Sequence, residues 1–450
     1  MFKSLIIILL WLFFMIGEFL VHYYDYLSME NSLRNSLSSL IHVFFCIFFT
    51  VQSSIYILIK QRHSSFSQCI YEYLILVLPM VMAHTILADH IYALNFLVFT
   101  ILLYHLLMYK NGFKKFNTKN AFPNDRIPLI SALRGLTYLI TGLAILAVDF
   151  RDFPRYLAKT ERFGYSLMDT GVGLFVTMSG IAHKDLCKNS FKDIVKGNVK
   201  IITILLVLGV GRFVSVKLLN YQEHITEYGV HWNFFFTIAV CKTISTILLY
   251  LYDHTLLLSI ITLICHESLL YTGLENWVFS ETPRDSLISA NREGITSCLG
   301  FVSIYLFAVH IRQILMNKDV TKFATLMQLV RETLLLWILT NWHLILPTSR
   351  TLANAGYCIF MDTILTTITM VMYFITVLID AKNDQISSIL STVNTNGLSY
   401  FLIANLFTGA VNLSVRTLFV SSSVTFIILN VYMVVTLALV GYVKKLGFKV

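Results

Sequence analysis

Charged residues are scarce in this chain. Asp, Glu, Lys and Arg make up 13% of its 450 residues, whereas 56% are hydrophobic. This composition excludes a soluble globular protein, because a chain of this length has no interior large enough to hide so much apolar surface from water. The chain also lacks an internal repeat, a low-complexity linker and a soluble domain. Any functional site must therefore be built from helix ends, short loops and the membrane interior.

Paired cysteines and several catalytic motifs are also missing. The seven cysteines lie mostly inside apolar stretches without a C-x-x-C pair, which is typical of small buried hydrophobic residues and not of a metal or redox site. The zinc motif H-E-x-x-H, the nucleophile motif G-x-S-x-G and a phosphate-binding glycine loop are absent. The sequence therefore predicts no metal site.

What the chain does have is a series of long apolar stretches. Fourteen of them approach the roughly 17–23 residues that a membrane-spanning helix needs. They lie at 4–23, 38–60, 70–87, 91–108, 131–148, 167–183, 199–217, 232–252, 255–274, 295–315, 326–346, 357–379, 397–413 and 423–443. The predicted fold class is an all-α polytopic membrane protein with about 13–14 transmembrane helices and short loops.

The first of these stretches stands apart from the others. Lys3 precedes the apolar run at 4–23, which is longer than a typical signal-peptide core and has no small-x-small cleavage site. These features favour a membrane anchor, with a signal sequence as the alternative. We therefore expect residues 1–30 to form an extra N-terminal hydrophobic segment and residues 31–450 to form one multi-pass domain.

The distribution of basic residues predicts the topology. We assign the net charge of +9 to basic loops and not to nucleic-acid binding, because Lys and Arg collect in the cytoplasmic loops of membrane proteins. The basic side, expected to be cytosolic with the C-terminus, carries 110–126, 184–200, 312–322 and the C-terminal tail. The opposite, lumenal side carries the loops 149–166, 218–231, 275–294, 347–356 and 414–422. Polar residues in these loops predict one cavity that opens to the lumen.

The densest group of charges lies in the first of these lumenal loops. Two apolar segments flank seven ionisable side chains, which are Asp149, Arg151, Asp152, Arg155, Lys159, Glu161 and Arg162. Each buried charge costs several kcal/mol unless it is paired or hydrated. We therefore expect this cluster to carry chemistry.

Five stretches of the chain resemble one known family. They read ILAVDFRDFPRYLAKTERFGYSLMDTGVG, YQEHITEYGVHWNFFFT, SANREGITSCLGFVSIYL, SRTLANAGY and NGLSYFLIANLFTGAVNLSVRT, and they follow the family's order between residues 130 and 420. The family is that of the inositol acyltransferases of glycosylphosphatidylinositol (GPI) anchor biosynthesis. The resemblance implies an enzyme of the endoplasmic reticulum membrane that transfers a fatty acyl chain, usually palmitoyl from palmitoyl-CoA, to the inositol of glucosaminyl-phosphatidylinositol.

The resemblance also implies which molecules take part. The substrates are glucosaminyl-phosphatidylinositol and acyl-CoA, with no further cofactor, no obligate protein partner and only membrane lipids around the enzyme. The missing nucleophile motifs favour direct transfer over a covalent acyl-enzyme. The family is expected to have thirteen spanning helices, so the stretch at 4–23 is extra.

A multi-pass lipid or solute transporter is the alternative function. It predicts polar groups near the midplane in two related halves, whereas the polar residues here cluster at one face.

Three residues are candidates for catalysis. By resemblance, Asp149 and Lys159 form the family's catalytic pair. Asp149 directly follows an apolar helix, where desolvation raises the pKa of a carboxylate and makes it a better base, and Lys159 is suited to stabilise an oxyanion or to hold the thioester. The alternative is an ordinary salt bridge that fixes the loop, from Asp149 to Lys159 or to Arg155. His231 is the rival base because the intrinsic pKa of histidine suits proton transfer; the alternative is an interfacial hydrogen-bonding residue.

Nine further residues are candidates for substrate binding. Trp232 is expected in the acyl groove or in an aromatic belt at the membrane surface, and Arg350 at a phosphate or at a helix end. Glu293 and Asn405 are expected to face the cavity, since polar groups in spanning segments are costly elsewhere. The full set is Arg155, Glu161, His224, Trp232, Asn233, Asn291, Glu293, Arg350 and Asn405.

Overall fold

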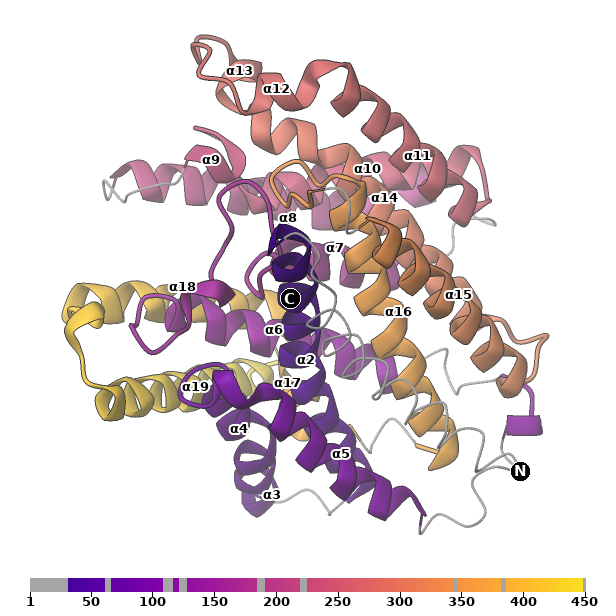
Figure 1. Ribbon diagram of the computed structural model, residues 1–450, viewed down its shortest axis with the longest axis vertical. Coiled ribbons are helices and arrows are strands. Elements are labelled where there is room, and N and C mark those ends of the chain that lie inside the picture. The colour runs from indigo at the N-terminus through magenta and orange to yellow at the C-terminus, as the bar shows by residue number, and fades with distance from the viewer. Residues whose placement is uncertain are drawn as a thin grey trace.

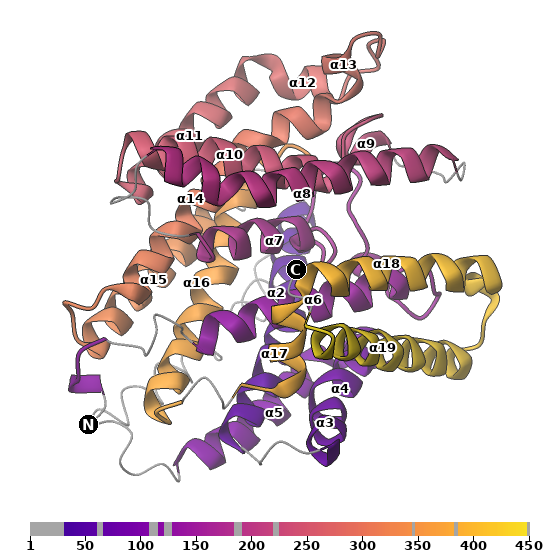
Figure 2. The same ribbon diagram turned by 180° about the vertical axis from the view of Figure 1, so that it is seen from behind.

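A computed structural model of the protein describes residues 31–60, 66–107, 116–120, 128–183, 191–218, 225–343, 347–381 and 386–447. Within these ranges the chain is built from helices and contains no β-strand, although an isolated antiparallel bridge joins Lys119 and Thr321. Figures 1 and 2 show the arrangement of the helices from two opposite sides. The predicted apolar stretch at 4–23 lies outside the described residues.

The helices range from single turns to long rods. In chain order they are α2 (Asn31–Ile59), α3 (Phe66–Glu72), α4 (Leu78–Ala83), α5 (Ile91–Leu107), α6 (Pro128–Ala147), α7 (Thr170–Ile181), α8 (Phe191–Leu218), α9 (Ile225–Tyr228), α10 (Phe234–Leu251), α11 (Thr255–Leu269), α12 (Glu275–Val278), α13 (Leu287–Ala290), α14 (Arg292–Met316), α15 (Lys322–His343), α16 (Ala355–Leu378), α17 (Ser388–Thr395), α18 (Gly397–Ser414) and α19 (Ser422–Lys445). Short π-helical turns connect α3 to α4 and α11 to α12.

The described helices account for thirteen of the fourteen predicted apolar stretches. Eleven segments are long and apolar enough to cross a membrane, and two shorter apolar helices lie at Ser67–Ala83 and Thr170–Ile181. The prediction of an all-α polytopic membrane protein is therefore confirmed. The eight-residue helix α17 is an addition that the sequence does not predict. The buried carboxylate of Glu72 accepts hydrogen bonds from its first backbone N–H groups, and this tertiary contact stabilises a helix too short to be stable alone.

Three helices form the centre of the bundle. In their membrane-spanning windows, 94% of α16, 89% of α2 and 83% of α14 is buried inside the protein. Two threonine hydroxyls of α16 are satisfied within the helix, since Thr363 donates to the carbonyl of Ile359 at 2.7 Å and Thr366 donates to that of Asp362 at 2.8 Å. A hydroxyl bonded to the preceding turn can lie in an apolar core at little cost.

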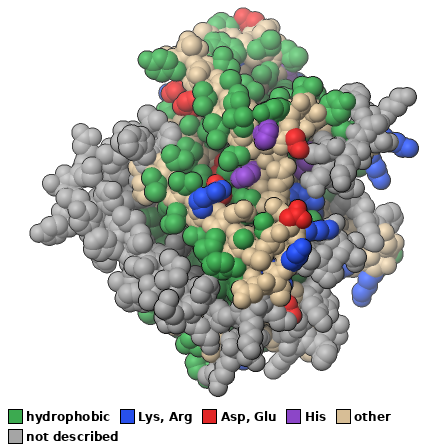
Figure 3. All heavy atoms as spheres, turned by 90° about the vertical axis from the view of Figure 1, so that its right-hand side faces the viewer, with side chains coloured by type: hydrophobic (Ala, Val, Ile, Leu, Met, Phe, Trp, Pro, Cys, Tyr) green, Lys and Arg blue, Asp and Glu red, His purple; other side chains and the backbone are tan. Residues whose placement is uncertain are grey.

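The outer helices present apolar side chains to their surroundings. Exposed examples on α11 and α15 are Leu257, Ile260, Ile261, Ile264, Leu334, Leu335, Ile338 and Leu339. Figure 3 shows the right-hand face of Figure 1, where hydrophobic side chains far outnumber charged ones among the described residues. A contiguous apolar surface of this extent is what helices in contact with lipid require.

The loops predicted on one side of the membrane meet at one end of the bundle. Gly164 N donates to Thr348 O at 2.8 Å and Val230 N donates to Ala290 O at 2.9 Å, so backbone hydrogen bonds join four of the five loops in pairs. The fifth loop, 414–422, is connected by Ser422, whose hydroxyl donates a hydrogen bond to Asp152 in the loop after α6. The short helices α12 and α13 lie at the top of Figure 1, and α9 lies below them at the upper left.

Close packing of α14 against the turn before α16 depends on Gly300. A Cβ added at this glycine would collide with the backbone oxygen of Ala353, whose own φ is 50°. We expect Gly300→Ala to destabilise the protein by about 1–3 kcal/mol, because backbone and not a flexible side chain must move. Gly409→Ala on α18 is the control, since no described atom lies within 4 Å of its added Cβ. Thermal unfolding in detergent measures both variants, and equal unfolding temperatures would contradict the prediction.

Candidate active site

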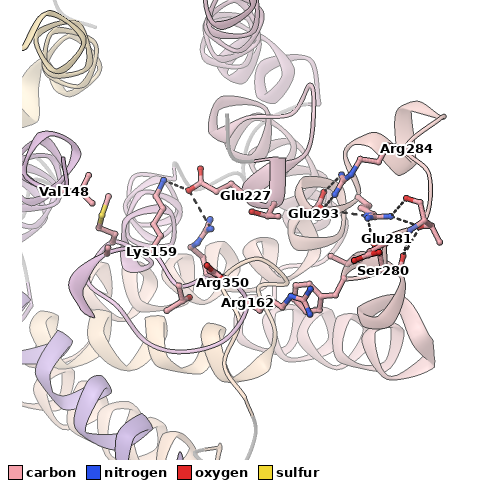
Figure 4. Close-up of a pocket in the computed structure, with 18 of the residues that line it drawn as sticks. Val148, Lys159, Arg162, Glu227, Ser280, Glu281, Arg284, Glu293 and Arg350 are labelled. Atoms are coloured by element: carbon pink, nitrogen blue, oxygen red, sulfur yellow. Dashed lines mark hydrogen bonds and ion pairs between the residues drawn. The ribbon is translucent and has the colours of Figure 1, made fainter. Parts of the chain in front are cut away.

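A cavity of about 1490 Å³ lies where the loops meet. Its walls come from the loop after α6, from α9, from the segment between α12 and α14, and from the turn before α16 (Figure 4). The lining residues are Val148, Asp149, Arg155, Ala158, Lys159, Thr160, Glu161, Arg162, Met168, Thr226, Glu227, Val278, Phe279, Ser280, Glu281, Thr282, Pro283, Arg284, Arg292, Glu293 and Arg350. The predicted site residues among them are Asp149, Arg155, Lys159, Glu161, Glu293 and Arg350.

Asp149 lies half-buried just after the end of α6. Its Oδ2 accepts a hydrogen bond from Asn412 Nδ2 of α18 at 2.8 Å. Burial raises the pKa of Asp149, and the Asn412 hydrogen bond and the charge of Arg155 oppose this rise only in part. Arg155 itself donates to the carbonyl of Val148 at 3.1 Å. A carboxylate with a raised pKa accepts protons more readily, so Asp149 has the properties of a general base.

The hydrogen bond from Asn412 lowers the pKa of Asp149, so a substitution at Asn412 should change that pKa. We expect Asn412→Asp to raise that pKa further, because the change removes a hydrogen bond to the carboxylate and adds a like charge. If Asp149 acts as a base, the acid limb of the plot of kcat/KM against pH then moves to higher pH, while the rate at high pH stays within a few-fold. Asn412→Leu, which removes only the hydrogen bond, should move the limb less. A limb that stays in place in both variants would contradict the assignment of Asp149.

Lys159 is directed toward Glu227. Its Nζ forms an ion pair with Oε1 of Glu227, which Figure 4 shows. Neither of the salt bridges considered for Asp149, to Lys159 or to Arg155, is formed in the described part of the chain. The side chain of Lys159 is 45% exposed, so the ammonium group remains accessible from the cavity.

Arg350, another residue of the cavity wall, forms a buried ion pair with Asp169. The guanidinium Nε donates to Asp169 Oδ1 at 3.0 Å, and both side chains are only 4% exposed. The other oxygen of Asp169 accepts from the hydroxyls of Thr160 and Ser166, each at 2.8 Å. Arg350 Nη2 also lies 3.8 Å from Glu227 Oε1. Every charge in this cluster has a partner, as burial requires.

A second charged group forms the opposite end of the cavity. Arg284 donates to both carboxylate oxygens of Glu293, at 3.0 and 2.5 Å, so the predicted cavity residue Glu293 lines the wall but is already paired. The buried Arg292 donates to the hydroxyl of Thr282 at 2.7 Å and to the carbonyl of Ser280. Figure 4 shows Arg284 and Glu293 next to each other and apart from Lys159. These bonds hold the segment between α12 and α14 against the bundle.

Four predicted residues support the cavity from outside its lining. Asn291 Oδ1 accepts from the backbone N–H groups of His231 at 2.8 Å and Trp232 at 2.9 Å. Asn233 caps the N-terminus of α10 with its side-chain oxygen. The His231 ring contacts Phe213 edge-on at 5.3 Å between centroids, and its buried Nδ1 has no hydrogen-bond partner among the described residues. These side chains hold the loop that carries α9 in place.

Of the two remaining predicted residues, one does not line the cavity and the other is not described. Asn405 lies in α18, where its side chain donates to the carbonyl of Phe401 at 2.7 Å, one turn earlier. His224 lies outside the described residues.

Three residues near the site are not among the site residues that the sequence predicts. Glu227 and Arg284 occur in polar loops and look like ordinary solvated charges, and only their ion pairs mark them. Asn412 carries one readable signal, because a polar residue inside a spanning stretch is costly unless it has a partner. The partner, Asp149, is 263 residues away in the chain and could not be deduced from spacing.

The cavity wall carries charges of both signs. Arg155, Lys159 and Arg162 are exposed cations in the wall, beside the exposed carboxylates of Glu161 and Glu281. Arg and Lys are the side chains that hold phosphate groups in proteins. In the described part of the chain, no group of three or more His, Cys, Asp or Glu side chains is arranged to hold a metal ion.

Comparisons with known proteins place the chain in a family. The GWT1 family model matches residues 29–443. The chain is 33% identical over 431 residues to GPI-anchored wall transfer protein 1 of Candida albicans, covering 84% of this chain and 88% of that protein. It is 31% identical over 456 residues to the glucosaminyl-phosphatidylinositol-acyltransferase PIGW of Bos taurus, covering 87% and 90% respectively. These matches confirm the resemblance found in the sequence, and the chain belongs to the GWT1 family.

Proposed function

We propose that the protein transfers a fatty acyl chain, palmitoyl in the first instance, from acyl-CoA to an inositol hydroxyl of glucosaminyl-phosphatidylinositol. The observation that carries this proposal is that Asp149 and Lys159 line one cavity at the end of a membrane-protein bundle. The name of the bovine relative, a glucosaminyl-phosphatidylinositol acyltransferase, supports the choice of acceptor and of reaction.

The size of the cavity supports direct transfer between two bound substrates. Its volume of about 1490 Å³ exceeds the roughly 300–1,000 Å³ of a typical ligand pocket. Two headgroups fit such a space at once, as a reaction without a covalent acyl-enzyme requires. The exposed cations Arg155 and Arg162 are suited to the phosphates of the coenzyme.

The chemical step uses the two charged residues in different roles. Asp149 takes the proton of the inositol hydroxyl while that oxygen attacks the carbonyl carbon of the thioester. The Lys159 ammonium group stabilises the negative charge that develops on the carbonyl oxygen. The tetrahedral intermediate then collapses, and the carbon–sulfur bond breaks as the electron pair moves to sulfur. The leaving thiolate takes up the proton that Asp149 accepted, which restores the Asp149 carboxylate. The products are the inositol ester and free coenzyme A.

The loop charges support a location for this cavity. The near-neutral loops that line it oppose the Lys-rich segments of the chain, so the positive-inside rule assigns the cavity to the lumenal side of the endoplasmic reticulum membrane and the C-terminus to the cytosol.

The proposal is tested in microsomes from cells that lack their own inositol acyltransferase. Membranes containing this protein receive labelled palmitoyl-CoA and glucosaminyl-phosphatidylinositol. The expected product is an acylated lipid that resists phosphatidylinositol-specific phospholipase C, because the modified inositol hydroxyl can no longer take part in cleavage. Membranes from untransfected cells are the control. Absence of product from correctly folded protein would contradict the proposed reaction.

A further inference from the structure

Glu227 lies at the junction of two cations that differ in exposure. Its Oε1 forms an ion pair with Lys159 Nζ and lies 3.8 Å from Arg350 Nη2. Both cations line the cavity, but the side chain of Lys159 is 45% exposed, whereas that of Arg350 is 4% exposed and is paired with the buried Asp169. The carboxylate of Glu227, 19% exposed, therefore connects a cavity-facing cation to the protein interior (Figure 4).

The interior end of this connection is rigid. Arg350 is held by its hydrogen bond to Asp169 at 3.0 Å, and its guanidinium lies over the ring of Tyr228 at 5.9 Å. Asp169 is held in turn by the hydroxyls of Thr160 and Ser166. Four charged groups thus run from the core to the cavity in the order Asp169, Arg350, Glu227 and Lys159. They come from the loop after α6, from α9 and from the turn before α16.

Glu227 stays charged in this setting. Burial alone would raise its pKa, but the positive charges of Lys159 and Arg350 outweigh that effect and lower the pKa. Its ionised carboxylate is therefore available as an anchor for an ammonium group.

Lysine needs such an anchor if it is to act on a reacting atom. Its ammonium group is a point charge on a flexible four-carbon stem, and a misplacement of about 1 Å at a reacting centre costs on the order of 100-fold in rate. Resting on the function proposed above, we propose that Glu227 is a positioning residue. It holds the ammonium group of Lys159 at the thioester carbonyl and takes its own position from the buried Arg350.

Kinetics of Glu227→Gln test this inference. We expect kcat to fall by roughly 10- to 100-fold, with the KM for acyl-CoA changed by less than about three-fold, because a positioning residue affects the transition state more than ground-state binding. Glu227→Asp keeps the charge on a shorter stem and should recover part of the loss. A rise in KM with an unchanged kcat would overturn the inference.

A double-mutant cycle separates positioning from a general structural role. In a Lys159→Gln background, Glu227→Gln should reduce the remaining rate by no more than about two-fold, because the residue it acts through is gone. Glu293→Gln is the matched control, since Glu293 is a buried cavity carboxylate paired with Arg284, and its effect should be the same in both backgrounds. An undiminished effect of Glu227→Gln without Lys159 would show a structural role and contradict the inference. If Lys159→Gln makes no detectable product, the cycle cannot be measured. The changes that Glu227→Gln alone causes in kcat and in KM then test the inference.

The wild-type protein in the same assay keeps the two proposals distinct. Product from wild type establishes the reaction, so a loss confined to the Glu227 variants concerns positioning alone. Absence of product from wild type contradicts the proposed function and the inference that rests on it.

Discussion

Asp149→Asn is expected to reduce acyl transfer by about 100- to 10,000-fold, the contribution of a general base. The amide has the shape of the carboxylate and can still accept the hydrogen bond from Asn412, so the fold should be retained. It cannot take the proton of the inositol hydroxyl. The measurement is the initial rate of phospholipase-resistant product per amount of folded protein in microsomes.

Two controls make this result specific. Asp152→Asn changes a carboxylate of the same loop that accepts a hydrogen bond from Ser422, and its activity should remain within a few-fold of wild type. His231→Gln tests the rival base, whose ring contacts Phe213 and does not line the described cavity wall. Full activity of Asp149→Asn together with loss in His231→Gln would transfer the role of base to His231.

Arg350→Met is expected to destabilise the protein by about 3–5 kcal/mol, the cost of removing one partner of a buried ion pair. Asp169 is 4% exposed and would lose the cation with which it forms its ion pair, and Glu227 would lose one of the two cations that lie within 4 Å of it. Thermal unfolding of the detergent-solubilised protein, together with the yield of folded protein, measures this effect.

The matched variants test the reason for the loss. Arg155→Met removes an exposed cation from the same cavity and should change stability by less than about 0.5 kcal/mol. Asp169→Asn combined with Arg350→Met removes both members of the pair, so it should be less destabilised than the sum of the two single variants. Additive losses would show that the pair is not coupled.

Much of the architecture could be predicted from the positions of the apolar runs in the sequence. A spanning helix needs an uninterrupted apolar run, and this signal is local, so thirteen of the stretches were found to within a few residues. The helix α17 was missed for the opposite reason. It is short, and its N-terminus is stabilised by Glu72, which lies more than 300 residues earlier in the chain.

Part of the candidate site could likewise be predicted from the sequence, and part could not. Asp149 and Lys159 could be identified because they lie in a loop of unusual charge density and in a stretch that resembles a known family. Their partners could not be identified, since Asn412 and Glu227 approach them only through folding. Asn291 and Asn233, which are expected to bind substrate, accept hydrogen bonds from backbone N–H groups. From sequence, a ligand-binding asparagine and a capping asparagine look alike.

The sequence by itself determined that the protein lies in a membrane, how many apolar spans follow residue 30, that the polar loops gather at one end, and the family. These properties follow from local hydrophobicity, from charge counts in loops and from contiguous motifs. Only the tertiary structure shows which charged side chains form ion pairs with one another. Lys159 pairs with Glu227 and not with Asp149, and the buried Arg350 joins Glu227 to Asp169. Such pairings depend on how helices pack in three dimensions, because in a medium of low dielectric each buried charge takes the nearest partner that packing offers.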